Sequence, residues 1–278
     1  MLGDDEPLTS PRWRRDRVIP ALLGLVLAGL VLSGCTGPTT PVAEPSTTAP
    51  STSPTALSTS ATTPPAAAPP QVGDCHQLAF TDLTQPTNSA PVVGCSSDHT
   101  SVTVAVLRHR SPDQVNAITD ACTKAVRRHI GATDLQLATT MIQTVWFLPD
   151  SPTSGWVRCD MVLYASSGKL APLPRKTANW WKRHRSDIGT CGTSAPGTAG
   201  FKRVLCGPGT PWRVLVALAV GGKAYPGVKA LRTQADLRCS DAVRLASNLA
   251  LKYAYGFEWP TKDQWRSGNH HLLCWMKR

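Results

Sequence analysis

The chain has 278 residues, with 29 Lys and Arg against 18 Asp and Glu, and its formal net charge at pH 7 is +11. This length allows one or two domains. No apolar run reaches the 18 residues of a membrane-spanning helix, and no collagen-like or heptad repeat occurs. Polytopic membrane, collagen-like and coiled-coil classes are therefore excluded.

The N-terminus has the pattern of a lipoprotein signal peptide over residues 1–34. Its apolar stretch runs from Val18 to Leu32 and follows four arginines, Arg12, Arg14, Arg15 and Arg17. A positive region followed by a short apolar region is typical of a signal peptide. The stretch ends in Leu32-Ser33-Gly34-Cys35, which resembles the lipobox of bacterial lipoproteins. The resemblance implies that Cys35 is lipidated and anchors the chain to the extracytoplasmic face of the cell membrane. An uncleaved membrane anchor is the alternative, although fifteen apolar residues are short for a span.

Residues 35–70 begin with the lipidated Cys35 and continue as a segment that cannot form a core. Positions 36–70 hold 9 Pro, 10 Thr, 5 Ser and 7 Ala. Such a composition buries too little apolar surface to offset the ordering entropy, so it predicts a disordered tether. The foldable part begins near residue 71 and is long enough for a hydrophobic core.

Eight cysteines remain after Cys35, and an even number in an exported chain predicts disulfides. They are Cys75, Cys95, Cys122, Cys159, Cys191, Cys206, Cys239 and Cys274. Zinc binding is the competing interpretation, but no Cys-x2-Cys or Cys/His knuckle is present. Eight cysteines formally allow 105 pairings. We therefore expect disulfides and no metal site, with the pairing still open at this point.

An internal repeat narrows the pairing. The run Cys122-Thr-Lys-Ala-Val-Arg127 matches Cys239-Ser-Asp-Ala-Val-Arg244, and Gly73-Asp-Cys75 corresponds to Gly189-Thr-Cys191. This predicts two tandem units with four cysteines each, over residues 71–168 and 189–278. The basic residues 169–188 are then an inter-unit linker.

Local patterns predict an α+β fold for each unit. Alternating apolar residues over 101–107 indicate a strand, a capping box over 111–114 begins a helix that ends at Gly131, and 144–148 with 155–164 form a hairpin. The second unit has the same order, with a strand over 212–220, a helix over 234–251 and strands near 253–259 and 269–276. Each unit is thus β-β-α-β-β, a small antiparallel sheet with one packed helix. Joining helix to last strand, and first cysteine to second, gives the bridges Cys75–Cys95, Cys122–Cys159, Cys191–Cys206 and Cys239–Cys274.

These residues resemble the septum-formation domain family of high-GC Gram-positive bacteria. The resemblance covers residues 71–278 and rests on Val-Gly-Asp-Cys75, Pro-Val-Val-Gly-Cys95-Ser-Ser-Asp-His99, Pro152-Thr-Ser-Gly-Trp156-Val-Arg-Cys159 and Trp259-Pro-Thr-Lys-Asp-Gln-Trp265. It implies an envelope lipoprotein associated with cell division and without enzymatic activity. The segment around His99 has no counterpart in the second unit, so a role for this histidine would belong to the first unit alone.

Signatures of catalysis are weak. Ser166-Ser-Gly-Lys169 fits Ser-x-x-Lys, but the companion elements of penicillin-recognising enzymes are missing. Asp98-His99 has the composition of an acid/base pair, although a locally bonded loop histidine is commoner. His270 and His271 lie on a strand, point to opposite faces and cannot share one ion. We therefore expect neither a catalytic site nor a cofactor.

Charge is the strongest functional signal. Residues 71–168 carry a net charge of −2 and residues 169–278 a net charge of +14. The segment 169–185 contains no acid, and its cations flank two adjacent tryptophans: Lys169, Arg175, Lys176, Trp180, Trp181, Lys182, Arg183 and Arg185. Cations beside indole rings suit anionic lipid headgroups, and wall polyanions would serve equally. The alternative is a solvated linker whose tryptophans pack on a neighbouring lobe. An exported chain does not meet nucleic acid.

These observations predict a non-enzymatic, lipid-anchored envelope protein with a binding or scaffolding role. The link to septum formation comes only from the resemblance. Two alternatives stay open: an envelope enzyme that acts on wall polymers, and a purely adhesive protein that binds anionic membrane or wall surfaces. The sequence names no partner protein.

Overall fold

The computed structural model describes residues 69–108, 114–149, 155–248 and 252–278. The signal peptide, Cys35 and the tether up to residue 68 lie outside these ranges, as does most of the predicted capping box at 111–114. Within the described ranges, no helix combines the length and the apolar character needed to cross a membrane. All the described residues belong to one compact unit.

The first half of this unit contains six strands, two α-helices and one 3-10 helix. They follow one another as β1 (Cys75–His76), the 3-10 helix η1 (Phe80–Thr84), β2 (Val92–Val93), β3 (Ser101–Arg108), α1 (Val115–Ile130), α2 (Asp134–Leu137), β4 (Ile142–Phe147), β5 (Trp156–Ser166) and β6 (Lys169–Ala171). The strand predicted at 101–107, the helix ending before Gly131 and the hairpin are all present. Gly131 ends α1 in the left-handed conformation, with φ of 74°, and its N–H donates to the carbonyls of Arg127 and Arg128.

The second half begins with two short helices and then repeats the order of the first. The elements are α3 (Trp180–His184), the 3-10 helix η3 (Arg185–Ile188), β7 (Thr190–Gly192), β8 (Arg203–Leu205), β9 (Trp212–Ala219), α4 (Val228–Ala246), β10 (Tyr255–Glu258), α5 (Lys262–Arg266) and β11 (His271–Lys277). Helix α4 starts six residues before the predicted start at 234. The helix follows Gly227, which lies at φ of 89°, and its first three side chains are exposed or half-buried, so the apolar pattern before Leu231 is weak.

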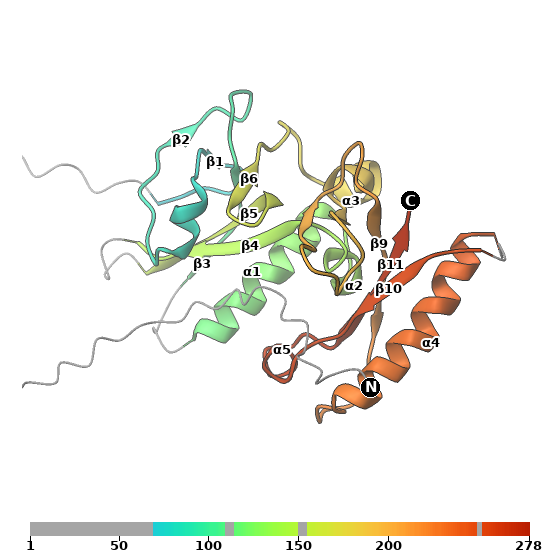
Figure 1. Cartoon of the computed structure of the whole chain (residues 1–278). Helices are drawn as coiled ribbons and strands as arrows, with labels where there is room; N and C mark the ends of the chain where they lie inside the picture. The colour runs from blue at the N-terminus through green and yellow to red at the C-terminus, as the bar shows by residue number, and fades with distance from the viewer. Residues whose placement is uncertain (1–68, 109–113, 150–154, 249–251) are drawn as a thin grey trace, which may run out of the picture. The chain divides into compact units, whose positions relative to one another are not determined.

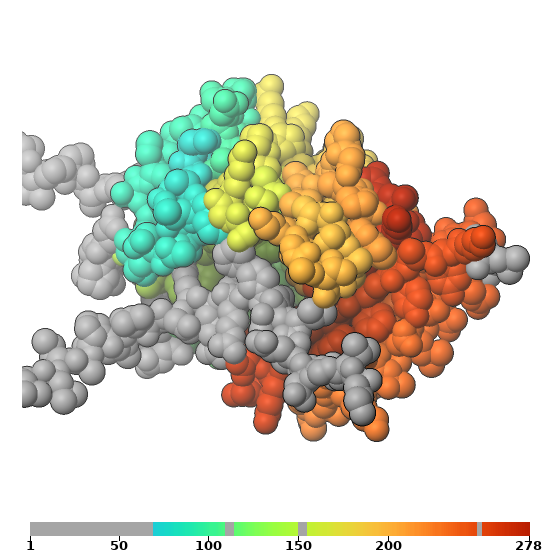
Figure 2. Space-filling view, in the orientation of Figure 1, coloured from blue at the N-terminus to red at the C-terminus, as the bar shows by residue number. Residues whose placement is uncertain are grey.

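The eleven strands of the described residues all belong to one sheet, and its strand pairs are antiparallel. The order is β10-β11-β9-β7-β8-β5-β3-β1-β2, with β4 and β6 also paired to β5. The halves join where Ser166 of β5 pairs with Val204 of β8. Two main-chain hydrogen bonds strengthen this junction, from the Met141 N–H to the Ile188 carbonyl (2.8 Å) and from the Thr190 N–H to the Thr139 carbonyl (3.0 Å). The surfaces of the two halves adjoin in Figure 2. The fold is mixed α and β with an antiparallel sheet, as predicted, but the strands do not divide into two separate sheets.

The repeat is nevertheless visible in the strand pairing. The first half has the order β2-β1-β3-β5-β4 and the second the order β8-β7-β9-β11-β10. The register agrees as well, because Cys75 pairs with Val102 as Cys191 pairs with Arg213. Each half contains three strands before its long helix, one more than predicted.

A β-bulge occurs at the same place in both halves. In the first, the register of β3 and β5 shifts between Thr103 and Ala105, opposite Cys159. In the second, the register of β9 and β11 shifts between Cys274 and Trp275. A bulge bends a strand locally and increases its twist. The shared position makes Cys159 equivalent to Cys274.

Four disulfides are present, and they join the pairs that the repeat predicts. The bridges are Cys75–Cys95, Cys122–Cys159, Cys191–Cys206 and Cys239–Cys274. All four stay within one half. Several disulfides in one chain indicate an oxidising compartment, so this is an extracytoplasmic protein.

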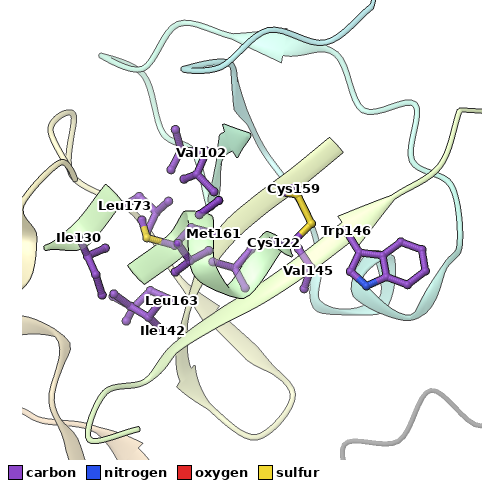
Figure 3. Packing of buried hydrophobic residues seen from close by; sticks show 14 of the residues in the cluster. Val102, Cys122, Ile130, Ile142, Val145, Trp146, Cys159, Met161, Leu163 and Leu173 are labelled. Carbon is purple, nitrogen blue, oxygen red and sulfur yellow. A yellow bond between two sulfur atoms is a disulfide. The ribbon is translucent and has the colours of Figure 1, made fainter. Parts of the chain in front are cut away.

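Each long helix covers the sheet of its own half. Helix α1 packs on β3, β4 and β5, and α4 packs on β10 and β11 (Figure 1). The larger core lies in the first half, around Cys122, Cys159 and Met161 (Figure 3), which are all fully buried. The second half has two smaller clusters, one centred on Trp275 and one on Leu231. The described residues thus contain their own cores and all four bridges, which is what a self-supporting domain needs.

The prediction that residues 169–188 form a linker needs correction, because this segment is folded. Strand β6 pairs with β5, and α3 and η3 follow it directly. Leu173, Trp180 and Ile188 are buried in the core of the first half. The contribution of residues 169–188 to the core is not apparent from the sequence, because the segment is rich in charge and only about one in four of its side chains is buried.

Candidate functional site

The basic segment 169–185 is held against the C-terminal end of α1. The N–H of Asn179 donates to the carbonyl of His129 (2.7 Å), and His129 Nε2 bonds Thr177 Oγ1 (2.8 Å). Burial lowers the pKa of His129, so this contact is made by a neutral imidazole at pH 7. The segment is therefore positioned by the fold.

The two tryptophans of this segment differ in environment. Trp180 is 5% exposed and belongs to the core, so the membrane contact predicted for it is wrong. Trp181 is only partly buried and packs against the edge of the same core. Trp181 alone retains an accessible indole surface.

The six cations of this segment are all exposed: Lys169, Arg175, Lys176, Lys182, Arg183 and Arg185. Three of them, Lys182, Arg183 and Arg185, line one open hollow together with Gly131, Gln136, Trp181 and Ser186. We call this the basic hollow. Asp187 is the acid nearest in sequence, and its carboxylate lies 3.9 Å from His184 and accepts a hydrogen bond from Ser186 (3.0 Å). The hollow combines three exposed cations with one indole, and the Arg183 guanidinium donates a hydrogen bond to the Ala178 carbonyl.

A second concavity lies beside α2, and no residue of the basic hollow lines it. Its smaller part, the polar cavity, measures about 90 Å³ and is lined by Ala138, Arg203, Glu258, Trp259, Gln264, Asn269, His271 and Leu273. It opens into a groove whose walls come from both halves of the chain, including α1, β4 and β5. The site therefore depends on the junction between the halves.

Glu258 is the central acid of the polar cavity. Its Oε2 accepts hydrogen bonds from Arg203 Nη2 (2.9 Å) and Trp275 Nε1 (2.8 Å). Arg203 Nε is buried and has no hydrogen-bond partner. Sequence reasoning missed this cluster, although one signal existed: Glu258 is the single glutamate after residue 44 and lies in an aromatic strand of a basic half.

The predicted division of His270 and His271 between opposite faces agrees with their contacts. His270 stacks on Trp265 with ring centroids 4.1 Å apart, and its Nε2 lies 2.9 Å from the Trp265 carbonyl oxygen. His271 lines the polar cavity instead. Burial, assisted by the charge of Arg203, lowers the pKa of His271 to about 4, so its ring is neutral at pH 7.

The remaining sequence candidates do not assemble into a catalytic site. His99 is 2% exposed and its Nδ1 lies 2.8 Å from the Ser97 carbonyl oxygen, whereas Asp98 is exposed. Ser166 and Lys169 pair across the β5–β6 hairpin. Within the described ranges, no group of three or more His, Cys, Asp or Glu side chains is arranged to hold a metal ion.

A buried polar cluster in the first half is a structural element that the sequence did not reveal. Asp160 is fully buried and accepts hydrogen bonds from Thr103 (2.9 Å) and Ser101 (3.2 Å), with Arg158 Nε 3.1 Å away. Burial raises the pKa of Asp160, while the Arg158 charge and the two hydroxyls act in the opposite direction. His76 lies near enough to stabilise the carboxylate electrostatically. A network of this kind stabilises the fold only while all its members are present.

The second half replaces this polar cluster by apolar packing. By strand register, Trp275 is the equivalent of Asp160, and Gly192 is the equivalent of His76. A Cβ atom on Gly192 would lie 2.7 Å from Phe201 and 3.3 Å from Trp275, so the glycine makes room for the indole. The halves share a backbone plan and differ in the chemistry of one sheet face.

Comparison of the chain with protein-family models, with curated proteins and with solved structures gives no match. The resemblance to septum-formation proteins therefore stays a prediction, and the argument for function depends on the two sites described above.

Proposed function

We propose that this protein is a non-enzymatic envelope protein that binds anionic surfaces through its basic hollow. The observation that carries the proposal is the convergence of Lys182, Arg183 and Arg185 with the accessible indole of Trp181. At a membrane surface each nearby Lys or Arg contributes about 1 kcal/mol, and indole rings favour the headgroup layer. Phosphate-bearing wall polymers offer the same negative charge, so lipid and wall are two sources of one ligand chemistry.

A lipid on Cys35 and the tether predicted over residues 36–70 would hold the folded part close to such surfaces. An extended tether of 35 residues reaches roughly 100 Å, so the folded part would still explore the wall. The repeat supports the view that the folded part arose from two copies of one disulfide-bonded unit. A role in septum formation is the finer form of the proposal and is supported by the cysteine frame of both units.

Vesicle co-sedimentation of the fragment 69–278 tests the basic hollow. We expect binding to vesicles that contain phosphatidylglycerol and none to pure phosphatidylcholine. Binding should weaken strongly as salt rises from about 0.02 M to 0.15 M, because exposed charges are screened over about 8–10 Å at the higher concentration. Purified anionic wall polymer replaces the vesicles in a parallel series and separates the two sources.

Two triple variants with equal loss of charge locate the site. Lys182→Ala, Arg183→Ala and Arg185→Ala together should weaken binding about 100-fold, from about 1 kcal/mol for each cation. The control triple replaces Lys223, Lys229 and Lys277, which are exposed on other elements. Equal losses in both triples would mean that net charge alone attracts the protein, which would contradict a localised site.

The anchor and the cellular role need separate experiments. Changing Cys35 to Ala should leave the protein unprocessed or release it from the membrane fraction, and unchanged processing would refute lipidation. Fluorescence imaging of the tagged protein separates a division role from general adhesion. Enrichment at midcell is expected for septum formation, and uniform envelope staining favours the purely adhesive alternative.

An enzyme acting on wall polymers is the second candidate, and the groove is the observation that favours it. Its two carboxylates, Asp134 and Glu258, are both engaged in ion pairs, with Arg127 at 2.5 Å and with Arg203 at 2.9 Å. Both carboxylates thus already have an arginine partner in the folded chain. Binding therefore explains the groove better than hydrolysis does.

A further inference from the structure

The polar cavity and its groove are distinct from the basic hollow, and their chemistry is different. The basic hollow presents unpaired positive charge, whereas each carboxylate beside the cavity is neutralised. Glu258 is paired with Arg203, and Asp134 with Arg127. His271 carries no charge at pH 7 because burial lowers its pKa. The cavity itself therefore presents no uncompensated charge, and Lys202, which is exposed on the groove wall, is the one cation of the site without an ion pair within the described residues.

Two hydrogen-bond donors at the cavity have no partner within the described residues. Arg203 Nε is buried without an acceptor. Asn269 uses its Oδ1 to accept the His271 N–H (3.3 Å), and its amide NH2 makes no hydrogen bond within the described residues. Arg203 Nε is closed to solvent, so the donor that a ligand oxygen can reach is the Asn269 amide, which is half-buried and not fully closed to water. The cavity therefore presents the Asn269 amide as a donor to an oxygen acceptor.

The walls of the site extend this chemistry in two ways. The groove next to the cavity is rich in hydroxyl groups, supplied in part by Thr119, Thr123, Thr140, Thr144, Thr190 and Thr198. The cavity itself includes Trp259, which is half-buried and tilted against Phe257 with ring centroids 5.8 Å apart. Hydroxyls both donate and accept, and an indole face is a flat apolar surface.

We infer that the polar cavity and its groove bind an uncharged sugar chain, with one ring or acetamido group in the cavity beside Trp259 and the following rings along the threonine-lined groove. A sugar ring offers this pattern of hydroxyl oxygens around an apolar face. The cavity volume of about 90 Å³ accommodates part of one ring, so the remainder of a chain must lie in the groove. The inference goes beyond the proposed function and does not depend on anionic binding.

Isothermal titration of the full chain, purified in a detergent without a sugar headgroup, tests the inference. The probes are N-acetylchitotetraose and cellotetraose, with tetraglutamate and spermine as charged comparisons. We expect at least one of the two oligosaccharides to bind, with neither charged probe competing. Absence of binding by both oligosaccharides at millimolar concentration would overturn the inference.

Variants at the cavity separate a specific site from a surface effect. Trp259→Ala should weaken sugar binding about tenfold, as expected for the loss of one aromatic contact, and Trp259→Phe should restore most of it. Ala138→Leu adds bulk to the cavity wall without removing any polar group, and it should abolish binding. Near-UV circular dichroism and thermal unfolding establish that each variant is folded. Unchanged sugar affinity in folded Ala138→Leu protein would refute the cavity as the binding site.

The triple variant of the basic hollow provides the cross-control. It should lose binding to anionic vesicles and keep the sugar affinity, whereas the cavity variants should do the reverse. Failure of one arm with success of the other therefore identifies which of the two sites is wrong. Parallel loss of both activities in either variant would contradict the independence of the sites.

Discussion

Removal of the two helix-to-strand disulfides measures how far the halves are energetically equivalent. The double variants Cys122→Ala/Cys159→Ala and Cys239→Ala/Cys274→Ala open loops with sequence separations of 37 and 35 residues. In the chain-entropy model each loop is worth about 3.8 kcal/mol. All four sulfur atoms are fully buried, and each lost atom costs about 1 kcal/mol more, as a buried methylene would. Each double variant should therefore lose about 5–6 kcal/mol of stability.

Equilibrium urea unfolding of the fragment 69–278 is the assay. Removal of the Cys191–Cys206 bridge is the internal reference, because its separation of 15 residues predicts a chain-entropy contribution of only about 3 kcal/mol. The reasoning fails if the two helix-to-strand variants differ by more than about 2 kcal/mol, or if either costs less than the reference.

Four further variants test the described environments. Trp180→Ala should cost about 3–5 kcal/mol of folding stability in urea unfolding, because removal of a buried indole leaves a cavity. Trp181→Ala should cost much less, because its indole is only partly buried. Equal costs would contradict this difference in burial. Asp160→Ala should cost about 3–5 kcal/mol because it leaves Arg158 buried without its partner, and a loss under 1 kcal/mol would show that the cluster is not a working network. The pKa of His271 falls to about 4 in the folded protein, from an unfolded value of 6.5, so its contribution to stability is present above pH 6.5 and is lost as pH falls toward 4. The loss of stability amounts to about 3 kcal/mol at most. Urea unfolding between pH 7 and pH 4.5 measures it in the unchanged protein and in His271→Gln, in which this loss should be absent.

Much of the fold follows from local sequence signals, because they are strong where the chain is periodic. The strand at 101–107 alternates apolar residues, and Gly131 ends a helix whose apolar residues recur at helical spacing. The disulfide pairs followed from the repeat, since equivalent cysteines must lie on equivalent elements. The division into separate sheets failed because the pairing of Ser166 with Val204 depends on one short contact between distant segments, which no local pattern encodes.

The sites were harder to predict than the fold. The cations of the basic segment were recognised by composition, but composition does not distinguish Trp180 from Trp181, because adjacent positions on a short helix face different environments. The polar cavity depends on Ala138 of one half meeting Glu258 and His271 of the other. Such a meeting is a property of tertiary structure, and the lone glutamate was the only trace of it in the sequence.

Asp160 and Trp275 occupy equivalent positions in the two halves, and this difference disfavours incorrect pairing of strands between the halves during folding. Two halves with the same strand order, the same bulge and matching cysteines offer each other plausible but incorrect partners during folding. If β3 paired with β11, Ser101 and Thr103 would lie against the Trp275 indole. The Asp160–Arg158 pair on β5 would then lose its two hydroxyl donors. Leaving a buried charge unsatisfied costs several kcal/mol, which is enough to disfavour the swapped pairing before the disulfides close. The buried carboxylate of Asp160 thus favours pairing of β5 with β3 of its own half over pairing between the halves.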